Sequence, residues 1–380
     1  MSKYFNSYHF FPEKEIKKIL SEIELSLNGS GFMTKGPLVK EFEKKHSELV
    51  GCKYSIATNS CTTALEIVFQ SIGLKNEDEV IVPVQTFFST GSSVINSGGK
   101  VVFCDTDENF SLSFSNLKAL ITNKTKAVVI VHFAGLIQED IFEIKKYLKE
   151  RNIYLIEDCA HATGASYRGI MAGNFGDFGC HSFYSSKIIT TGEGGMITTN
   201  EKNNYYSCKS ISSIGIDIEN NIEQFKRFGS NYRMSEIQGI LGLSQLKNLN
   251  KFINHRNLIA KTYYDELNSL FKSGKIRFQI FDSENTLHVY WKFLVFINDK
   301  SINVEKLTDD LLNEGFSIMA PYKPLLHLQP AFKKMFSTYE GQFPICEEVS
   351  KYHVSLPIHL SIKKSDAEFI ARKFKLHIEK

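Results

Sequence analysis

The sequence lacks a marked excess of charge of either sign and any long apolar run. It contains 45 lysines and arginines against 42 aspartates and glutamates, which gives a formal net charge of +3. Because phosphate backbones are usually bound by a concentrated basic patch, this balance argues against nucleic acid as a partner. No apolar stretch is long enough to span a bilayer, and residues 1–11 lack the apolar run of a signal peptide. We therefore expect a soluble protein that does not associate with membranes.

Cysteines are few and widely spaced. There are seven of them, an odd number, and no C-x-x-C pattern occurs. A disulfide framework usually has an even number of cysteines and a zinc site usually has closely paired ligands, so neither is expected. Reduced thiols are typical of the cytoplasm, and we expect a cytoplasmic protein without a metal site.

Two common nucleotide-binding motifs are also absent. A dinucleotide-binding fold would carry G-x-G-x-x-G after its first strand, and a P-loop has its own glycine and lysine spacing. Neither pattern is present where it would be needed. Another chemistry therefore has to be considered.

Short apolar runs alternate with helical patterns through the first two-thirds of the chain. The runs cover residues 80–82, 101–103, 127–131, 153–156 and 195–198. Unbroken apolar runs are typical of strands that are buried on both faces. Apolar residues recur at helical spacing between them, as in residues 65–72 and 141–148. This alternation predicts an α/β protein with a mainly parallel sheet and helices on both of its faces.

The pattern changes near residue 250. A charged helical segment over 251–270 is followed by predicted strands over 276–280 and 289–297 and a predicted helix over 304–313. A chain of 380 residues is long for one domain. We predict a large domain over residues 1–250 and a smaller α+β domain over 251–380.

Polar side chains follow three of the predicted strands, namely Asp105, His132 and Asp158. Ligands of a parallel sheet bind at the carboxyl ends of its strands. A buried carboxylate needs a partner, and a protonated pyridine nitrogen would suit Asp158, because a cationic ring withdraws electrons from a carbanion. On position alone, a helix N-cap or a salt bridge is the favoured interpretation.

A lysine stands between an aromatic-rich segment and a glycine cluster. Lys187 ends residues 181–187, and the cluster over 192–195 follows it. A lysine amine can form a Schiff base with an aldehyde cofactor, and partial desolvation lowers its pKa so that it can shuttle protons. The alternative is an ordinary surface lysine.

Residues 59–65 and Phe87 are further candidates for ligand binding, beside Asp158 and Lys187. The start of the predicted helix at Thr62 offers free N–H groups to a phosphate, with the hydroxyls of Ser60 and Thr62 beside them, although the same residues serve plain N-capping. Phe87 follows a strand and can stack on a flat ring or simply fill the core. A phosphate cradle, a stacking ring, an acid and an amine are together what pyridoxal 5'-phosphate requires.

These residues resemble the DegT/DnrJ/StrS family of nucleotide-sugar aminotransferases over nearly the whole chain. The matching stretches are residues 36–43, 79–86, 156–162, 182–195, 231–238 and 324–332, of which 182–195 is the most specific. The resemblance implies the aspartate-aminotransferase-like fold, fold type I of the pyridoxal-phosphate-dependent transferases.

The resemblance also implies a role for each site residue. Lys187 would carry the cofactor and Asp158 would pair with the pyridine nitrogen. The remaining cofactor contacts would be His161 at the ring hydroxyl, Phe87 as the stacking ring, and Ser60, Cys61, Thr62 and Ser182 at the phosphate. Asn231 would reach the phosphate of the neighbouring subunit's cofactor, which implies a homodimer with shared active sites. His327 lies in a stretch that resembles enzymes acting on 4-keto-6-deoxy sugars, and would bind substrate.

Two positions depart from the family pattern. The phosphate turn usually reads Ser-Gly-Thr, whereas here it is Ser60-Cys61-Thr62. The residue before Ser182 is usually phenylalanine, and here it is His181, for which we predict a packing role.

The implied function is transfer of an amino group from glutamate to a nucleotide-linked keto sugar, with C4 favoured over C3, as in deoxyamino sugar biosynthesis. A sugar dehydratase of the same fold would have histidine in place of Lys187. A non-enzymatic regulator would not need Lys187, Asp158 and the phosphate-binding groups together.

Overall fold

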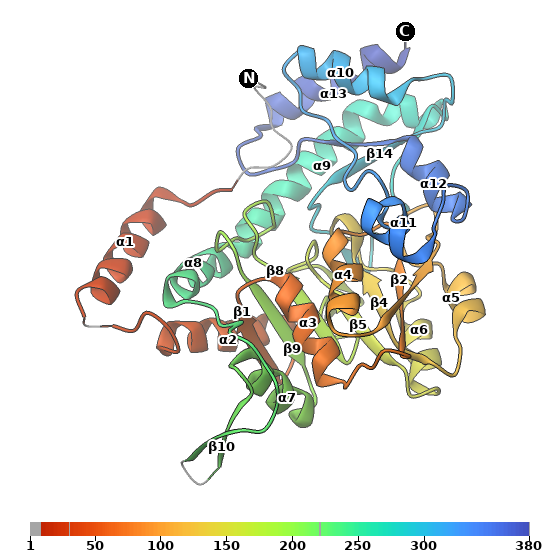
Figure 1. Cartoon of the computed structure of the whole chain (residues 1–380). Helices are drawn as coiled ribbons and strands as arrows, with labels where there is room; N and C mark the ends of the chain where they lie inside the picture. Colours follow the sequence, from red (N-terminus) through yellow and green to blue (C-terminus); the bar gives the residue numbers. More distant parts are fainter. Residues whose placement is uncertain (1–8, 30, 220–221, 380) are drawn as a thin grey trace.

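A seven-stranded sheet forms the centre of the molecule (Figure 1). The computed structural model describes residues 9–29, 31–219 and 222–379. In spatial order the strands are β1 (Tyr54–Thr58), β9 (Gly195–Thr199), β8 (Phe178–Ser182), β5 (Tyr154–Asp158), β4 (Thr125–Val131), β2 (Glu79–Pro83) and β3 (Lys100–Cys104). From β8 to β3 every pair is parallel, whereas β9 runs antiparallel to both of its neighbours. The predicted α/β class with a mainly parallel sheet is confirmed.

The apolar runs form the buried strands because both faces of the sheet are covered. In β4, Val128 and Ile130 face one core, whereas Ala127 and Val129 face the other, as expected from strand alternation. The first core is closed by α2 (Pro37–Val50), α5 (Phe114–Leu120) and α6 (Ile141–Lys149). The second is closed by α3 (Cys61–Ser71), α4 (Phe88–Asn96) and α7 (Lys202–Ser212). The predicted helices on both faces are therefore present.

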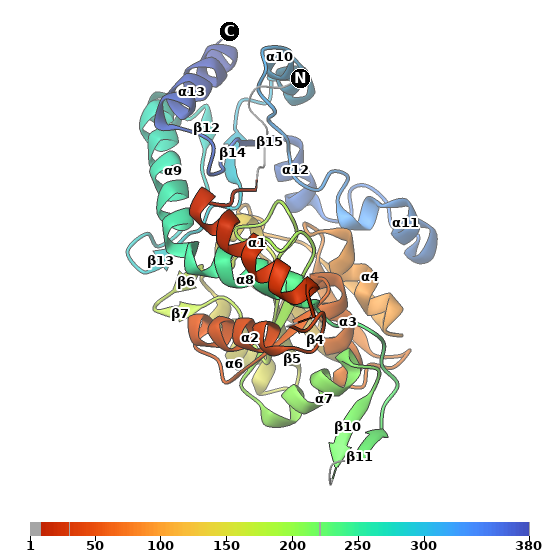
Figure 2. The same cartoon turned by 90° about the vertical axis from the view of Figure 1, so that its left-hand side faces the viewer.

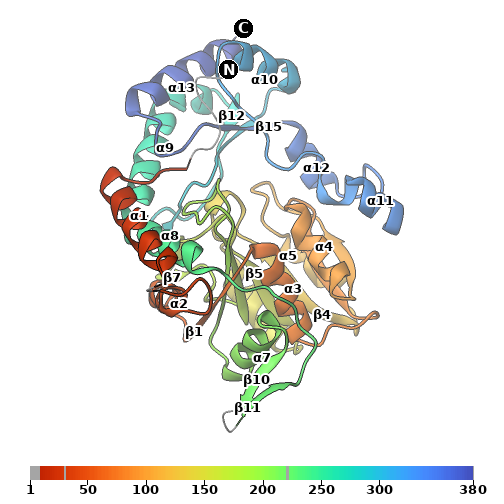
Figure 3. The ribbon, with the colours of Figure 1, turned by 60° about the vertical axis from the view of Figure 1, so that its left-hand side comes forward.

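A second, smaller sheet follows in the chain. It consists of β12 (Ile276–Arg277), β14 (Phe293–Ile297) and β15 (His353–Leu356), all antiparallel. The helices α9 (Leu249–Lys272), α10 (Val304–Asn313) and α13 (Lys364–Glu379) pack with it around a third core built from residues 259–378. Figure 3 shows this part at the opposite end of the molecule from α7. The division at residue 250 stays a prediction, since α9 crosses it and Trp291 belongs to the core of the large sheet.

Two predicted strands of this part are shorter than expected. The strand expected over 276–280 ends at Arg277, because the N–H of Ile280 donates to the side-chain oxygen of Asn109 at 3.0 Å. The strand expected over 289–297 begins only at Phe293, because the N–H groups of Val289 and Lys292 donate to carbonyls of residues 134–135 near the large sheet. The chain therefore contacts the large sheet before it enters the small one.

The remaining elements lie around these two sheets. They are α1 (Glu13–Leu27), α8 (Glu236–Lys247), α11 (Pro330–Phe336), α12 (Pro344–Lys351), the 3-10 turns η1 (Phe133–Gly135) and η2 (Leu326–Leu328), and the strands β6 (Ser166–Tyr167), β7 (Ile170–Met171), β10 (Ile216–Glu219), β11 (Ile222–Phe225) and β13 (Thr286–Leu287). Figure 2 shows α1 lying across α8, and the β10–β11 hairpin projecting from the body beside α7. Within the described ranges, no helix has both the length and the apolar character needed to cross a bilayer.

Candidate active site

A cavity of about 460 Å³ lies at the carboxyl ends of β5 and β8, where the predicted site residues meet. The residues that line it and were predicted from the sequence are Ser60, Cys61, Thr62, Phe87, Asp158, His161, Ser182 and Lys187. Trp291 and Tyr322 add a wall from the C-terminal third of the chain. On the side of the cavity opposite this wall, α3 and α4 begin. Their N-terminal N–H groups therefore point toward the edge of the sheet where the parallel strands end.

Asp158 is the last residue of β5 and is buried. Its carboxylate accepts hydrogen bonds from the hydroxyl of Thr90 at 2.9 Å and from the N–H of Ala160 at 3.0 Å. Burial raises the pKa of Asp158, and these two hydrogen bonds and the nearby Lys187 oppose that effect. A cationic group of a ligand would stabilise the carboxylate further, as a protonated ring nitrogen would.

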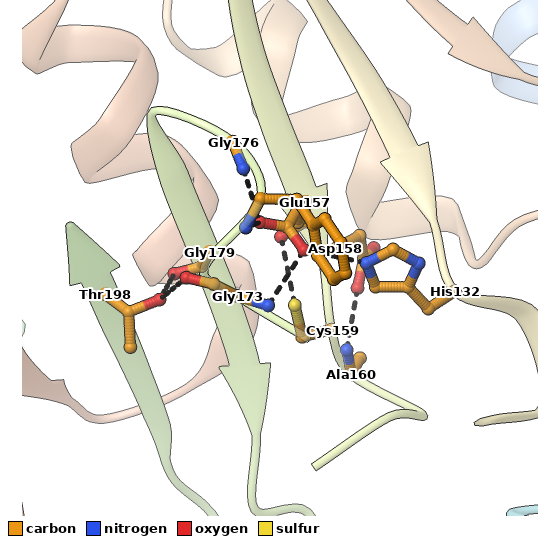
Figure 4. A network of polar contacts seen from close by, with 10 residues as sticks. His132, Glu157, Asp158, Cys159, Ala160, Gly173, Gly176, Gly179 and Thr198 are labelled. Atoms are coloured by element: carbon orange, nitrogen blue, oxygen red, sulfur yellow. Dashed lines mark hydrogen bonds and ion pairs between the residues drawn. The ribbon is translucent and has the colours of Figure 1, made fainter. Parts of the chain in front are cut away.

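Glu157 precedes Asp158 on the strand and therefore points to the other side, where it is fully buried (Figure 4). Its carboxylate accepts the backbone N–H groups of Gly173, Phe175 and Gly176 at 2.7–2.8 Å. The ring of His132 lies 2.8 Å from the same carboxylate. The network ties β4, β5 and the loop before β8 together, and it fixes the strand that positions Asp158.

Of the three polar residues predicted at strand ends, only Asp158 lines the cavity. His132 bonds to Glu157 instead, beneath the cavity. Asp105 accepts the N–H groups of Ile345 and Cys346 at 3.1 and 2.9 Å, at the N-terminus of α12. Asp105 therefore holds a helix, which is the ordinary role of a carboxylate at that position.

Lys187 lies in the turn after β8, where its N–H donates to the carbonyl of Tyr184 at 2.9 Å. Its amine lies 4.4 Å from the centroid of the Trp291 ring. Burial lowers the pKa of Lys187 to about 8, against the opposing charges of Asp158 and Cys61. A neutral fraction of the amine is therefore present near neutral pH, which is what a lysine nucleophile or proton carrier requires.

The phosphate end of the cavity is the start of α3. Ser60 caps this helix, since its hydroxyl accepts the N–H of Thr63 at 3.2 Å, and it also lines the cavity. The N-cap role of Ser60 is therefore confirmed, whereas its contact with a phosphate stays a prediction. The thiol of Cys61 donates to the carbonyl of Cys180 at 3.6 Å, which directs the side chain toward β8 and explains why the turn tolerates it. A Cβ on Gly195 would lie 2.4 Å from the Ser60 carbonyl, so glycine is required beside this turn.

Aromatic rings form the opposite wall. The His161 Nε2 atom and the Tyr322 hydroxyl are 2.7 Å apart, and the His161 ring stacks on Trp291 with centroids 3.7 Å apart and planes at 9°. Burial lowers the pKa of His161 well below its usual value, so the ring is neutral. Its buried Nδ1 atom has no hydrogen-bond partner among the described residues. Phe87 is half exposed, 5.5 Å from Tyr322, and its ring is available for stacking.

Ser182 and His181 occupy adjacent positions on β8 with different surroundings. The hydroxyl of Ser182 accepts the N–H of Tyr184 at 3.4 Å and lines the cavity. His181 points away and packs edge-on against His46, with centroids 4.5 Å apart, and it is fully buried. The structure thus gives His181 the packing role predicted for it.

Two predicted site residues do not line the cavity. Asn231 is exposed and forms an isolated bridge with Ser213, so its contact with a neighbouring subunit stays a prediction. His327 does not line the cavity either, and the substrate contact predicted for it stays a prediction. Its ring is fully buried, 4.7 Å from the Phe343 ring, with Nε2 3.2 Å from a carboxylate oxygen of Glu347. It therefore packs η2 against the start of α12.

The sequence profile described as the DegT/DnrJ/EryC1/StrS aminotransferase family matches residues 13–375. The chain belongs to this family. It is 31% identical to GDP-perosamine synthase of Escherichia coli O157:H7, covering 90% of this chain and 91% of the relative. It is also 31% identical to a UDP-4-amino-4,6-dideoxy-N-acetyl-beta-L-altrosamine transaminase of Campylobacter jejuni, covering 89% of each.

A solved structure shows the same architecture. A putative sugar aminotransferase of Streptococcus pneumoniae in its PLP form superimposes with a TM-score of 0.88 at 25% identity, covering 100% of this chain and 99% of that one. The same bacterial protein has been solved in a PMP form. The protein described here is accordingly a pyridoxal-phosphate-dependent aminotransferase with the predicted fold type I.

The cavity fits this cofactor. It offers one amine to an aldehyde, one carboxylate to a ring nitrogen, and the N-terminus of α3 to a phosphate. The buried Nδ1 atom of His161 lacks a partner that a ring hydroxyl would supply. Lys187, Asp158, Thr62 and Ser182 are the residues that would hold the group.

We expect Lys187→Ala to abolish covalent attachment of the cofactor. After incubation with pyridoxal phosphate and reduction with borohydride, peptide mass spectrometry should find the adduct on Lys187 in the unchanged protein and none in the variant. Transamination should fall by roughly 10²–10⁴-fold, the range for loss of an acid–base group. Lys292→Met is the matched control, because Lys292 is also a buried lysine near Trp291. An adduct on another lysine would refute the assignment.

We expect Glu157→Gln to destabilise the fold. The amide of glutamine would face N–H donors that the carboxylate now accepts, and each buried donor left unpaired costs about 1–3 kcal/mol. The midpoint of urea unfolding should fall accordingly. Glu143→Gln, at an exposed position of α6, should leave the midpoint within experimental error. Equal midpoints for both variants would show that the Glu157 network is not stabilising.

Proposed function

We propose that the protein transfers an amino group from glutamate to C4 of a nucleotide-linked 4-keto-6-deoxy sugar. The observation that carries the proposal is the buried amine of Lys187 in the same cavity as Asp158, within an aminotransferase of this family. The name of the Campylobacter relative describes a 4-amino-4,6-dideoxy sugar. The name of the Escherichia relative describes a GDP-linked sugar, perosamine. These names support a nucleotide sugar and favour C4.

The residues that line the cavity have different roles in transamination. When bound, pyridoxal phosphate supplies an aldehyde that carries the amino group and a ring that accepts electrons. Lys187 takes a proton from the Cα atom of the amino donor and returns protons during amination of the sugar, and its pKa of about 8 suits both directions. Asp158 holds a positive charge at the ring nitrogen. Trp291 and Tyr322 wall off the cavity on the side of the C-terminal segment.

The arginines of the C-terminal third support a sugar over an amino acid as the acceptor. Aminotransferases for amino acids usually clamp the substrate carboxylate with a bidentate arginine. No arginine is among the residues found to line this cavity. Arg256 is buried and donates to the carbonyls of Tyr290 and Ile358, and Arg277 donates to the carbonyl of Glu108. Arg372 lies beside Glu266 on the surface.

We further propose a homodimer with shared active sites. Asn231 lies outside the cavity of its own chain and is exposed close to the β10–β11 hairpin. The hairpin and the residues after it expose Ile222, Phe225 and Phe228, and α1 exposes Leu20 and Leu27. Exposed apolar groups of this kind are typical of surfaces that a partner covers.

The reaction is tested with protein, pyridoxal phosphate, glutamate and a panel of UDP-, dTDP- and GDP-linked keto sugars. We expect 2-oxoglutarate to be released stoichiometrically with an amino sugar for at least one 4-keto-6-deoxy sugar. A sugar whose keto group is at C3 serves as the control for position. Release with simple α-keto acids and with no keto sugar would overturn the proposal.

The shared site is tested by mixing two inactive variants, Lys187→Ala and Asn231→Ala. If Asn231 acts across the interface, a mixed dimer contains one site with Lys187 from one subunit and Asn231 from the other. Unfolding and refolding the two variants together should then restore activity, to at most about a quarter of the sites for random pairing. Refolding each variant alone is the control. If Asn231 served its own subunit, or if the active species sedimented as a monomer, no activity would return.

A further inference from the structure

The chain contains a single tryptophan, Trp291, and the reaction described above uses it only as part of a wall. The residue is buried, although it lies just before β14 and outside any strand. Its side chain contacts four residues that line the cavity, namely His161, Ser186, Lys187 and Tyr322, and also lies near Lys292. Packing alone therefore does not explain why a tryptophan lies at this position.

Three contacts fix the indole relative to Lys187. The indole N–H donates to the carbonyl of Ser186, the residue before Lys187, at 2.9 Å. One ring face stacks on His161 at 3.7 Å. The Lys187 amine lies 4.4 Å from the ring centroid, within the distance at which an ammonium group interacts with an aromatic face. Trp291 thus contacts the carbonyl of the preceding residue through its N–H and the Lys187 amine through its ring.

The amine of Lys187 is not always attached to the cofactor during transamination. When it is released, it needs a place where it can carry a proton without leaving the cavity. An indole face attracts an ammonium group because the face of the ring carries partial negative charge, and this attraction is strongest where water is scarce. Trp291 offers such a face in a buried site.

We propose that Trp291 is a positioning residue that binds the protonated amine of Lys187 whenever this amine is detached from the cofactor. Its N–H holds the backbone next to Lys187, so that the amine returns to the same place. The proposal rests on the role assigned above to Lys187. It gives a residue from the C-terminal third of the chain a role in the reaction.

Other titratable groups lie around the pair, and the test has to separate them. Those that line the cavity or face the two residues are Cys61, Asp158, His161, Tyr184, Glu193, Lys292 and Tyr322. Asp158 favours the protonated amine, and burial opposes it. Lys292 is the main competitor, because its amine lies 5.1 Å from the Trp291 centroid and burial lowers its pKa to about 7.

The first measurement follows the reactivity of Lys187 directly. The full-length protein is loaded with pyridoxamine phosphate, which has no aldehyde, and is treated with an acylating reagent from pH 6 to 10. Peptide mass spectrometry gives the rate at Lys187, whose midpoint should lie near pH 8. Trp291→Leu removes the ring face and should lower the midpoint by about 0.5–1 unit, which makes Lys187 roughly 2.5–5.5-fold more reactive at pH 7. Trp291→Phe keeps a ring without the N–H and should lower it less.

An unchanged or raised midpoint in folded Trp291→Leu would overturn the proposal. A purely structural role would lower the melting temperature of this variant and leave the midpoint of Lys187 where it was. Thermal unfolding of each variant is therefore recorded alongside.

The second measurement keeps Trp291 in place and uses its fluorescence, which no other residue of the chain contributes at the red edge of excitation. We expect the emission of the loaded protein to titrate near pH 8, to lose this titration in Lys187→Met, and to keep it in Lys292→Met. Titration that persists in Lys187→Met, or that is lost only in Lys292→Met, would assign the ring to the other lysine and refute the proposal. Neither measurement uses a sugar or an amino donor, so its failure is distinguishable from failure of the proposed reaction.

Discussion

Two groups of opposite charge have to remain inside the protein for this site to work, and burial disfavours the charged form of each. Desolvation raises the pKa of Asp158 and lowers that of Lys187. The fold compensates with backbone donors and neighbouring charge. Asp158 accepts an N–H and a hydroxyl proton, and the two groups favour each other's ionised form. The carboxyl ends of parallel strands, where loop N–H groups converge, are the part of the sheet that can provide this.

The strand that carries Asp158 is held from its other face. Because side chains alternate along β5, Glu157 points away from the cavity and takes three N–H groups from the loop before β8. The loop in turn leads into the strand that ends at Ser182, five residues before Lys187. The spacing between the carboxylate and the amine thus depends on a buried charge that touches neither ligand nor substrate.

Much of this arrangement follows from the sequence. Apolar runs with helical segments between them predict a parallel sheet, and a parallel sheet brings its carboxyl ends to one edge, so that Asp158 was expected at the ligand-binding edge. The glycines that follow Lys187 marked it as a candidate, and the family resemblance implied its role. These inferences use local patterns, and local patterns fix elements well when the strands are buried on both faces.

Other features depend on contacts between distant segments, which no local pattern encodes. The residues 289–292 have the apolar character of a strand, yet two of their N–H groups bond to η1. His327 matched a substrate-binding stretch by resemblance, and its burial against Phe343 follows from how α12 packs. Trp291 and Tyr322 carried no sequence signal beyond the rarity of tryptophan, because their role comes from facing residues more than 100 positions earlier in the chain, such as His161 and Ser186.

The site is complete only when the two halves of the chain pack against each other. Gly135, with φ of +97°, lies against this segment, and a Cβ there would lie 2.7 Å from the Val289 side chain and 3.1 Å from the Trp291 nitrogen. A side chain at this position would push Trp291 away from Ser186 and His161, and would also be strained by the left-handed backbone. Lys187, Asp158 and His161 come from the first half, whereas Trp291 and Tyr322 come from the second. Closure of the cavity around the amine therefore depends on how the C-terminal third packs, both at this close approach between η1 and the segment before β14 and where residues 321–326 bond to Val84 and Gln85.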